Sequence, residues 1–344
     1  MDSLEEMLAL EGADEVEALF RKAYAVKLEH IGPRVSVRGL IEAGNACAKD
    51  CFYCGIRKSN LKVQRYELKE DEMVELARKA KDFGYASVVI QSGEIESEEH
   101  TRKIERTVQR IAELNMGITL SLGEQDADVY KRWREAGATR YLLRIETANR
   151  QMYARLHPES HSYDRRLKCL KELRKCDYQV GTGVMCALPG ESVQDLADAI
   201  RFFRDEDVDM IGMGPYIPHP DTPLGVGVEL DKERRLITGL KMIAAARITL
   251  PKVNIAAATA LQALAEDGRE RGIKAGANVL MPNVTDVEYR ANYQLYAGKP
   301  CLNENAGLCR ACLDRRLEAI GEKILYGERG DSLRYFERCR NEQR

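Results

Sequence analysis

The sequence has almost no net charge and no extreme of composition. In 344 residues, 53 lysines and arginines stand against 55 aspartates and glutamates, so the formal charge is −2. A chain this balanced gives no electrostatic reason to expect a nucleic acid as partner. Its 26 glycines and 10 prolines are near the average for globular domains, and 44% of its residues are hydrophobic. These values exclude a disordered or collagen-like chain.

Long apolar segments are also missing. No run approaches the roughly 18 uncharged apolar residues that would span a bilayer. Residues 1–16 are rich in acidic side chains where a secretory signal would have a basic end and an apolar stretch. We therefore expect a cytoplasmic protein that does not enter membranes. In a reducing compartment its ten cysteines are expected to be metal ligands, reactive thiols or small buried residues before disulfides.

What the sequence does contain is a repeated alternation of short apolar runs with segments able to form helices. Residues 98–114, for example, carry Ile104, Val108 and Ile111 at helical spacing. The run 88–90 is apolar without alternation, as expected in a parallel sheet covered on both faces. The predicted strands are 35–42, 88–93, 118–123, 140–146, 179–188, 210–218, 254–260 and 277–283.

Eight such units predict an α/β fold of the (β/α)8 TIM-barrel type, although an open doubly wound sheet would use the same units. We expect a helical segment in residues 1–34, the barrel in residues 35–300 and a C-terminal segment with a helix in residues 301–344. No linker rich in proline, glycine or serine separates them. In such a barrel, active-site residues are expected at the carboxyl ends of the strands.

Three cysteines follow the first predicted strand. Cys47, Cys51 and Cys54 have the spacing C-x3-C-x2-C. Three thiolates this close can bind three irons of a cubane 4Fe–4S cluster and leave the fourth iron open to a small molecule. A structural zinc with its fourth ligand from elsewhere and chance clustering of cysteines are the alternatives. The position after a barrel strand favours the cluster.

The triplet, with Tyr53 before its last cysteine, resembles the signature of the radical S-adenosylmethionine (SAM) superfamily. Further segments are similar, in order along the chain, to the HydE family of FeFe-hydrogenase maturases. They are QSGE at 91–94, LSLGE at 120–124, YLLRIETAN at 141–149, GPYIPHPDTP at 214–223 and ANVLMPN at 277–283.

The resemblance implies that the open iron holds the amino and carboxylate groups of SAM. One electron then cleaves SAM to methionine and a 5′-deoxyadenosyl radical, which makes Cys47, Cys51 and Cys54 catalytic. The implied SAM-binding residues are Tyr53, Glu94, Ser121, Glu146 and Arg166. The two glutamates can accept hydrogen bonds from ammonium or hydroxyl groups, and Arg166 can pair with the carboxylate. A solvated surface ion pair is the alternative for Arg166.

The resemblance also implies a substrate, a small iron complex with CO, cyanide and cysteine ligands that is used in assembly of the hydrogenase H-cluster. The matching substrate positions are Thr119, Arg140, Arg144, Met210 and Met281. Arginines inside a barrel require an anion, and soft methionines suit a metal complex, although plain core filling is their commoner role. Glu146 is expected to neutralise Arg144, which shares its strand face, and to leave Arg140 as the freer cation.

A second triplet, Cys301-x7-Cys309-x2-Cys312, follows the last predicted strand. It resembles the auxiliary cluster site of some maturases, so a second cluster of the 2Fe–2S or 4Fe–4S type is expected there. A zinc site completed by Cys339 or a histidine is the alternative.

The partners implied are a small anionic organometallic or amino-acid-derived substrate, a reductant protein and other hydrogenase maturases. Three other functions stay open: a mutase like methylornithine synthase, a sulfur-inserting enzyme like biotin synthase, and a non-enzymatic carrier of iron–sulfur or metal–ligand units. A sulfur inserter needs a second cluster inside the barrel, whereas the second triplet follows the barrel. A carrier needs no SAM site.

Overall fold

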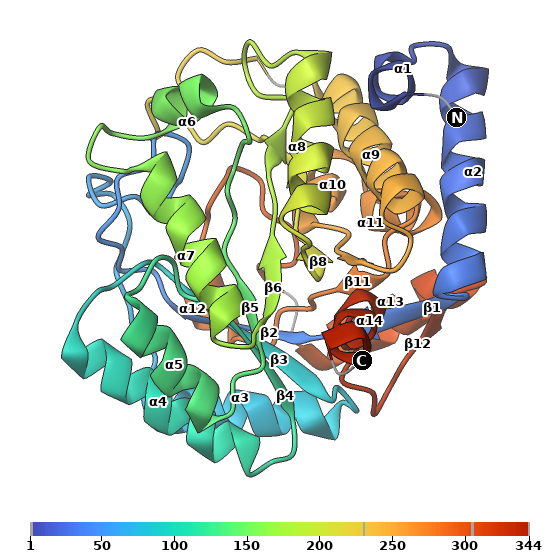
Figure 1. Cartoon of the computed structure of the whole chain (residues 1–344). Coiled ribbons are helices and arrows are strands. Elements are labelled where there is room, and N and C mark those ends of the chain that lie inside the picture. The colour runs from blue at the N-terminus through green and yellow to red at the C-terminus, as the bar shows by residue number, and fades with distance from the viewer. Residues whose placement is uncertain (1–2, 230, 304–305, 343–344) are drawn as a thin grey trace.

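Parallel strands surround the centre of the molecule in the computed structural model, which describes residues 3–229, 231–303 and 306–342 (Figure 1). Seven of them form a sheet in the order β10-β8-β6-β5-β4-β3-β2. β11 closes the ring, because Val279 bridges to Ala256 beyond β10 and Asn283 bridges to Leu40 of β2. The predicted TIM-type α/β barrel is therefore confirmed. Its strands are β2 (Gly39–Gly44), β3 (Ser87–Ser92), β4 (Gly117–Ser121), β5 (Arg140–Leu142), β6 (Gln179–Thr182), β8 (Met210–Ile211), β10 (Asn254–Ile255) and β11 (Val279–Leu280).

Several predicted strands are interrupted. The run 35–42 divides at Arg38 into β1 (Arg34–Val37) and β2, and β1 pairs with β11 and with β12 (Lys323–Ile324). The runs 179–188 and 210–218 each contain a second short strand, and these two strands pair with each other as β7 (Met185–Cys186) and β9 (Gly214–Pro215). The ladder thus continues towards the mouth of the barrel on one side of the ring.

Helices cover the outside of the ring (Figure 1). α4 (Glu98–Ala112) buries Ile104, Val108 and Ile111 as the sequence pattern predicts, and the hydroxyl of Ser97 caps its start by accepting from the backbone N–H of His100 at 3.2 Å. The others between the strands are α3 (Glu70–Asp82), α5 (Ala127–Ala136), α6 (Arg150–Leu156), α7 (Tyr163–Lys175), α8 (Val193–Asp205), α9 (Lys232–Thr249), α10 (Thr259–Leu264), α11 (Gly268–Lys274) and α12 (Val287–Arg290).

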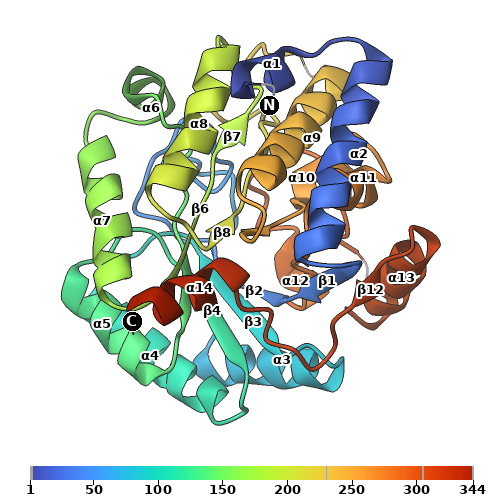
Figure 2. The same ribbon diagram turned by 45° about the vertical axis from the view of Figure 1, so that its right-hand side comes forward.

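Both terminal segments pack on the barrel (Figure 2). The N-terminal helices α1 (Leu4–Ala9) and α2 (Ala13–His30) contact α8 and α9. The C-terminal segment contains α13 (Ala306–Ala319), the unpredicted strand β12 and α14 (Leu333–Glu342). Because β12 pairs with β1, residues 328–332 pass beneath the amino ends of the barrel strands. The division at residues 34 and 300 stays a prediction.

No helix in the ranges that the structure describes is both long enough and apolar enough to cross a membrane.

Candidate active site

The three cysteines of the first triplet lie in the loop that follows β2, at the carboxyl end of the barrel. Backbone hydrogen bonds tie this loop to three segments that are distant in the sequence. They join Ala48 N to Glu94 O (2.8 Å), Phe52 N to Leu156 O (2.9 Å) and Gly55 N to Leu295 O (2.9 Å). The loop is therefore fixed over the mouth of the barrel.

Gly93, at the end of β3, lets the backbone pass directly beside the cysteine loop. A Cβ at this position would lie 2.1 Å from the carbonyl oxygen of Ala46 and 2.8 Å from the Cβ of Cys47. The close approach brings the backbone N–H of Glu94 within 3.3 Å of the Sγ of Cys47, to which it donates. Hydrogen bonds of this kind to a cluster sulfur tune an iron–sulfur centre.

Burial disfavours the ionised form of the three thiols. Burial raises the pKa of Cys47, raises that of Cys51 to about 12 and raises that of Cys54 far above its usual value. Three thiolates in such a place require a compensating cation, which the irons of a cluster supply. In the described ranges, no three His, Cys, Asp or Glu side chains converge as a single metal ion requires. A cubane binds each thiolate through a different iron, so the donor set fits a cluster better than a zinc ion.

Below the cysteine loop lies a cavity of about 350 Å³. Side chains from all round the ring line it, and most of the residues predicted for SAM and substrate are among them. Those that line it are Cys47, Cys51, Tyr53, Cys54, Glu94, Ser121, Arg144, Glu146, Arg166 and Met281.

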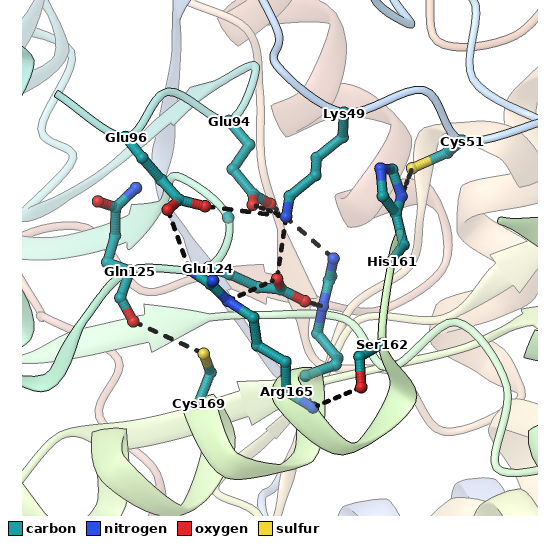
Figure 3. Close-up of polar contacts among 12 residues, drawn as sticks. Lys49, Cys51, Glu94, Glu96, Glu124, Gln125, His161, Ser162, Arg165 and Cys169 are labelled. Carbon is teal, nitrogen blue, oxygen red and sulfur yellow. Dashed lines mark hydrogen bonds and ion pairs between the residues drawn. The ribbon is translucent and has the colours of Figure 1, made fainter. Parts of the chain in front are cut away.

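A network of charged side chains lies beside this cavity, and Figure 3 shows its contacts. Lys49, from the cysteine loop, places its Nζ 3.0 Å from the Oε1 of Glu94 and 3.1 Å from the Oε2 of Glu124. Arg166 Nε donates to Glu124 Oε1 at 2.6 Å. Arg166 is only 7% exposed, so the alternative of a solvated surface pair is wrong. Sequence reasoning missed Lys49 and Glu124, although Glu124 ends the LSLGE segment.

The buried carboxyl groups of Glu94 and Glu124 differ in how far the nearby cations stabilise their charge. Burial raises the pKa of Glu94, and Arg166 and Lys49 do not offset burial together with the nearby Glu124 carboxylate. Burial acts on Glu124 in the same direction, but there Arg166 and Lys49 outweigh it, so the pKa lies below its usual value. Glu124 therefore keeps Arg166 neutralised. Glu94 is the carboxyl that would gain most from a further cation, such as the ammonium of a ligand.

Arg144 and Glu146 form the ion pair expected from their shared strand face, with Nη2 and Oε2 2.9 Å apart. The pair lacks hydrogen-bond geometry. Arg144 Nε and Nη2 and Glu146 Oε2 are buried without a hydrogen-bond partner among the described residues. Glu146 also has a φ of +67°, a strained conformation for a residue with a side chain. Orphaned polar atoms and strain beside the cysteines fit a ligand that has both amino and carboxyl groups.

The structure does not bring Thr119, Arg140 and Met210 to this cavity. They lie beneath it, towards the amino ends of the barrel strands, where Arg140 Nε donates to the hydroxyl of Thr119 at 3.0 Å and Met210 Sδ contacts Arg38 at 3.0 Å. Arg140 is 3% exposed and pairs with Asp331. The prediction that Arg140 is the freer cation is therefore wrong, because the C-terminal segment supplies a carboxylate that strand spacing could not reveal.

Cys301 and Cys312 of the second cysteine triplet do not line the cavity. Cys301 stands in the loop before α13 and its carbonyl accepts from Arg290 Nη1 at 3.0 Å, while Cys312 lies within α13. Cys309 is also in α13, but its side chain lies outside the described residues. The auxiliary cluster thus stays a prediction.

Comparison with known proteins gives consistent results. The family model for the radical SAM superfamily matches residues 41–203. The FeFe hydrogenase maturase subunit HydE of Thermotoga maritima is 42% identical over 320 residues, which cover 93% of this chain and 90% of that protein. The 3-methylornithine synthase of Methanosarcina acetivorans is 28% identical over 85% of this chain and 82% of its own. The solved structure of methylornithine synthase (PylB) matches with a TM-score of 0.80 at 26% identity, over 94% of this chain and 93% of that one.

The fold and the site define a barrel enzyme built for an iron–sulfur cluster. The chain belongs to the radical SAM superfamily and, within it, to the family of the maturase subunit HydE. It is accordingly a radical SAM enzyme, and its family implies a 4Fe–4S cluster and SAM as cofactors.

Proposed function

We propose that this chain is a maturase of FeFe-hydrogenase that acts through SAM on a small iron precursor of the H-cluster. The observation that carries the proposal is the 42% identity to a hydrogenase maturase subunit, which extends over 93% of this chain and 90% of the relative. The match is therefore long enough to include the cysteine loop and the cavity.

In this proposal Cys47, Cys51 and Cys54 hold the 4Fe–4S cluster. The residues toward SAM are Tyr53, Glu94, Ser121, Glu146 and Arg166. The cluster and SAM together supply, on one-electron reduction, a 5′-deoxyadenosyl radical. The carboxylates of Glu94 and Glu146 accept from the ammonium and hydroxyl groups of SAM. The barrel wall around the cavity would limit the access of water and stray hydrogen donors to the radical.

The proposed substrate is the iron complex with CO, cyanide and cysteine ligands. Arg144 and the soft side chain of Met281 line the chamber in which it would bind. Thr119, Arg140 and Met210 would act from the floor beneath it. We also propose a reductant protein and other hydrogenase maturases as partners, an auxiliary cluster on Cys301, Cys309 and Cys312, and a cytoplasmic location.

A mutase like methylornithine synthase is the second candidate. It is favoured by the TM-score of 0.80 to the solved methylornithine synthase and by the 28% identity to such an enzyme. The higher identity to the maturase and the second cysteine triplet favour the maturase instead. A sulfur inserter is less well supported. In the described part of the chain the cavity has no cysteine besides the first triplet, so a second cluster would lack thiolate ligands there.

A maturation assay tests the proposal. Inactive hydrogenase is incubated anaerobically with the other maturases, SAM, a reductant and this chain, and hydrogen production is measured. We expect hydrogenase activity that depends on this chain and is lost with Cys54→Ala. Formation of 3-methylornithine from a mixture of amino acids, without activation of the hydrogenase, would establish the mutase instead.

A further inference from the structure

Arg269 stands out among the cations of the cavity because no described residue forms a hydrogen bond or an ion pair with its side chain. It lies in α11, lines the cavity and is 8% exposed. Its Nε is buried without a hydrogen bond, and no ion pair to its guanidinium is found within the described ranges. Glu270, the next residue, cannot neutralise it, because that carboxylate pairs with Arg316 of α13.

Every other cation that lines the cavity is paired with a carboxylate. Lys49 and Arg166 contact Glu124, Arg144 contacts Glu146, and Lys299 contacts Glu42. Among the cations that line the cavity, the Arg269 guanidinium is therefore the one without a carboxylate partner in the described ranges. Such a buried charge is costly and is tolerated where a ligand provides the missing anion.

The position of Arg269 separates it from two of the residues proposed for SAM, Ser121 and Glu146. α11 connects β10 to β11, and these two strands lie across the ring from β4 and β5, which carry Ser121 and precede Glu146. Arg144, which follows β5, lines the same cavity as Arg269. The two arginines therefore face one chamber from different sides.

We propose that Arg269 determines substrate specificity by binding a carboxylate of the small molecule that reacts in this cavity. A guanidinium offers a planar fork of donors that matches the two oxygens of a carboxylate, so the pair is both strong and oriented. The identity of that molecule as a cysteine-ligated iron complex rests on the proposed function. The carboxylate itself is inferred from the unpaired guanidinium, whose fork of donors matches two oxygens.

The test uses the anaerobically reconstituted holoenzyme and two probes. One is the iron–CO–cyanide–cysteine precursor, and the other is the same complex made with cysteine carboxamide. Each is titrated into the parent protein and into Arg269→Met, Arg269→Lys and Arg271→Met. Arg271 lies on the same helix but is partly exposed and contacts Glu233 at 3.9 Å, so it is the matched control. Cluster absorbance and circular dichroism show that each variant is folded.

Arg269→Met should bind the precursor at least about tenfold more weakly than the parent, the effect of losing one charge-assisted hydrogen bond. Its affinity for the carboxamide should equal that of the parent, and its affinity for SAM should not change. Arg269→Lys should recover part of the loss, and Arg271→Met should behave as the parent. Should Arg269→Met not fold, the lysine variant alone must still bind the precursor more weakly than the parent and the carboxamide equally well.

Equal binding of the precursor by the parent and by the Arg269 variants would overturn the subsite while leaving the proposed function intact. A loss of affinity for SAM with normal precursor binding would assign Arg269 to the cofactor and overturn it as well. A parent protein that binds neither probe would overturn the proposed function and this subsite together.

Discussion

Arg140 and Asp331 form an ion pair at the floor of the barrel, although 191 positions separate them in the chain. Gln179 also holds this segment: its side-chain nitrogen donates to Asp331 at 2.7 Å, and its side-chain oxygen accepts from the backbone N–H of Ser332 at 3.0 Å. The C-terminal segment thus seals the end of the barrel opposite the cysteines. A closed floor keeps water from a cavity in which a radical is formed.

Removal of the Asp331 carboxylate should therefore destabilise the fold and leave SAM binding unchanged. Asp331→Ala leaves Arg140 buried with only its neutral partners, so we expect a loss of about 2 to 3 kcal/mol in the free energy of unfolding. Denaturant titration measures the loss. Glu328→Ala removes an exposed carboxylate from the same segment and should change the stability little. Equal stability of the two variants would contradict the structural role of Asp331.

The floor also shows what the sequence could and could not predict. The barrel follows from the repeated apolar runs, and the cysteine loop follows from the spacing of Cys47, Cys51 and Cys54. The partner of Arg140 could not be predicted from the sequence. The Asp331 carboxylate comes from the C-terminal segment, which is joined to the barrel through β12, and this strand has only two residues. Short strands carry too little periodicity to be recognised. Arg269 was missed for a different reason: a charged residue on a short helix is normally exposed, so nothing in the sequence marks it as buried.

His157 should make the protein sensitive to acid. Burial lowers its pKa to about 3, and the neutral ring donates from Nδ1 to the carbonyl of Tyr153 at 2.9 Å. An unfolded histidine takes up a proton near pH 6.5, so the unfolded state binds more protons below that pH and stability falls as the pH falls from 6.5 towards 3. This one group should cost about 2 kcal/mol between pH 7 and pH 5.

The measurement is denaturant unfolding of the cluster-free protein at the two pH values. His157→Gln should lose about 2 kcal/mol less than the parent between them. His30→Gln, at the end of α2, is the control and should follow the parent. The same pH dependence in His157→Gln and in the parent would show that His157 is not held neutral by the fold.

The second cysteine triplet should be dispensable for cleavage of SAM, because Cys301 and Cys312 do not line the cavity. The variant with Cys301, Cys309 and Cys312 all changed to alanine should lose iron after reconstitution but still form 5′-deoxyadenosine. Iron analysis and product chromatography give the two quantities. Unchanged iron content would exclude the auxiliary cluster, and complete loss of cleavage in a folded variant would exclude its accessory role.

Reductive cleavage of SAM tests most directly whether the first cysteine triplet forms a radical SAM centre. The anaerobically reconstituted protein is given SAM and dithionite, and 5′-deoxyadenosine is measured for the parent, Cys51→Ala and Cys176→Ala. Cys176 lies at the end of α7, outside the cavity, and serves as the control. We expect the parent and Cys176→Ala to form 5′-deoxyadenosine and Cys51→Ala to form none. Formation at the parent rate by Cys51→Ala would contradict the assignment of this site as a radical SAM centre.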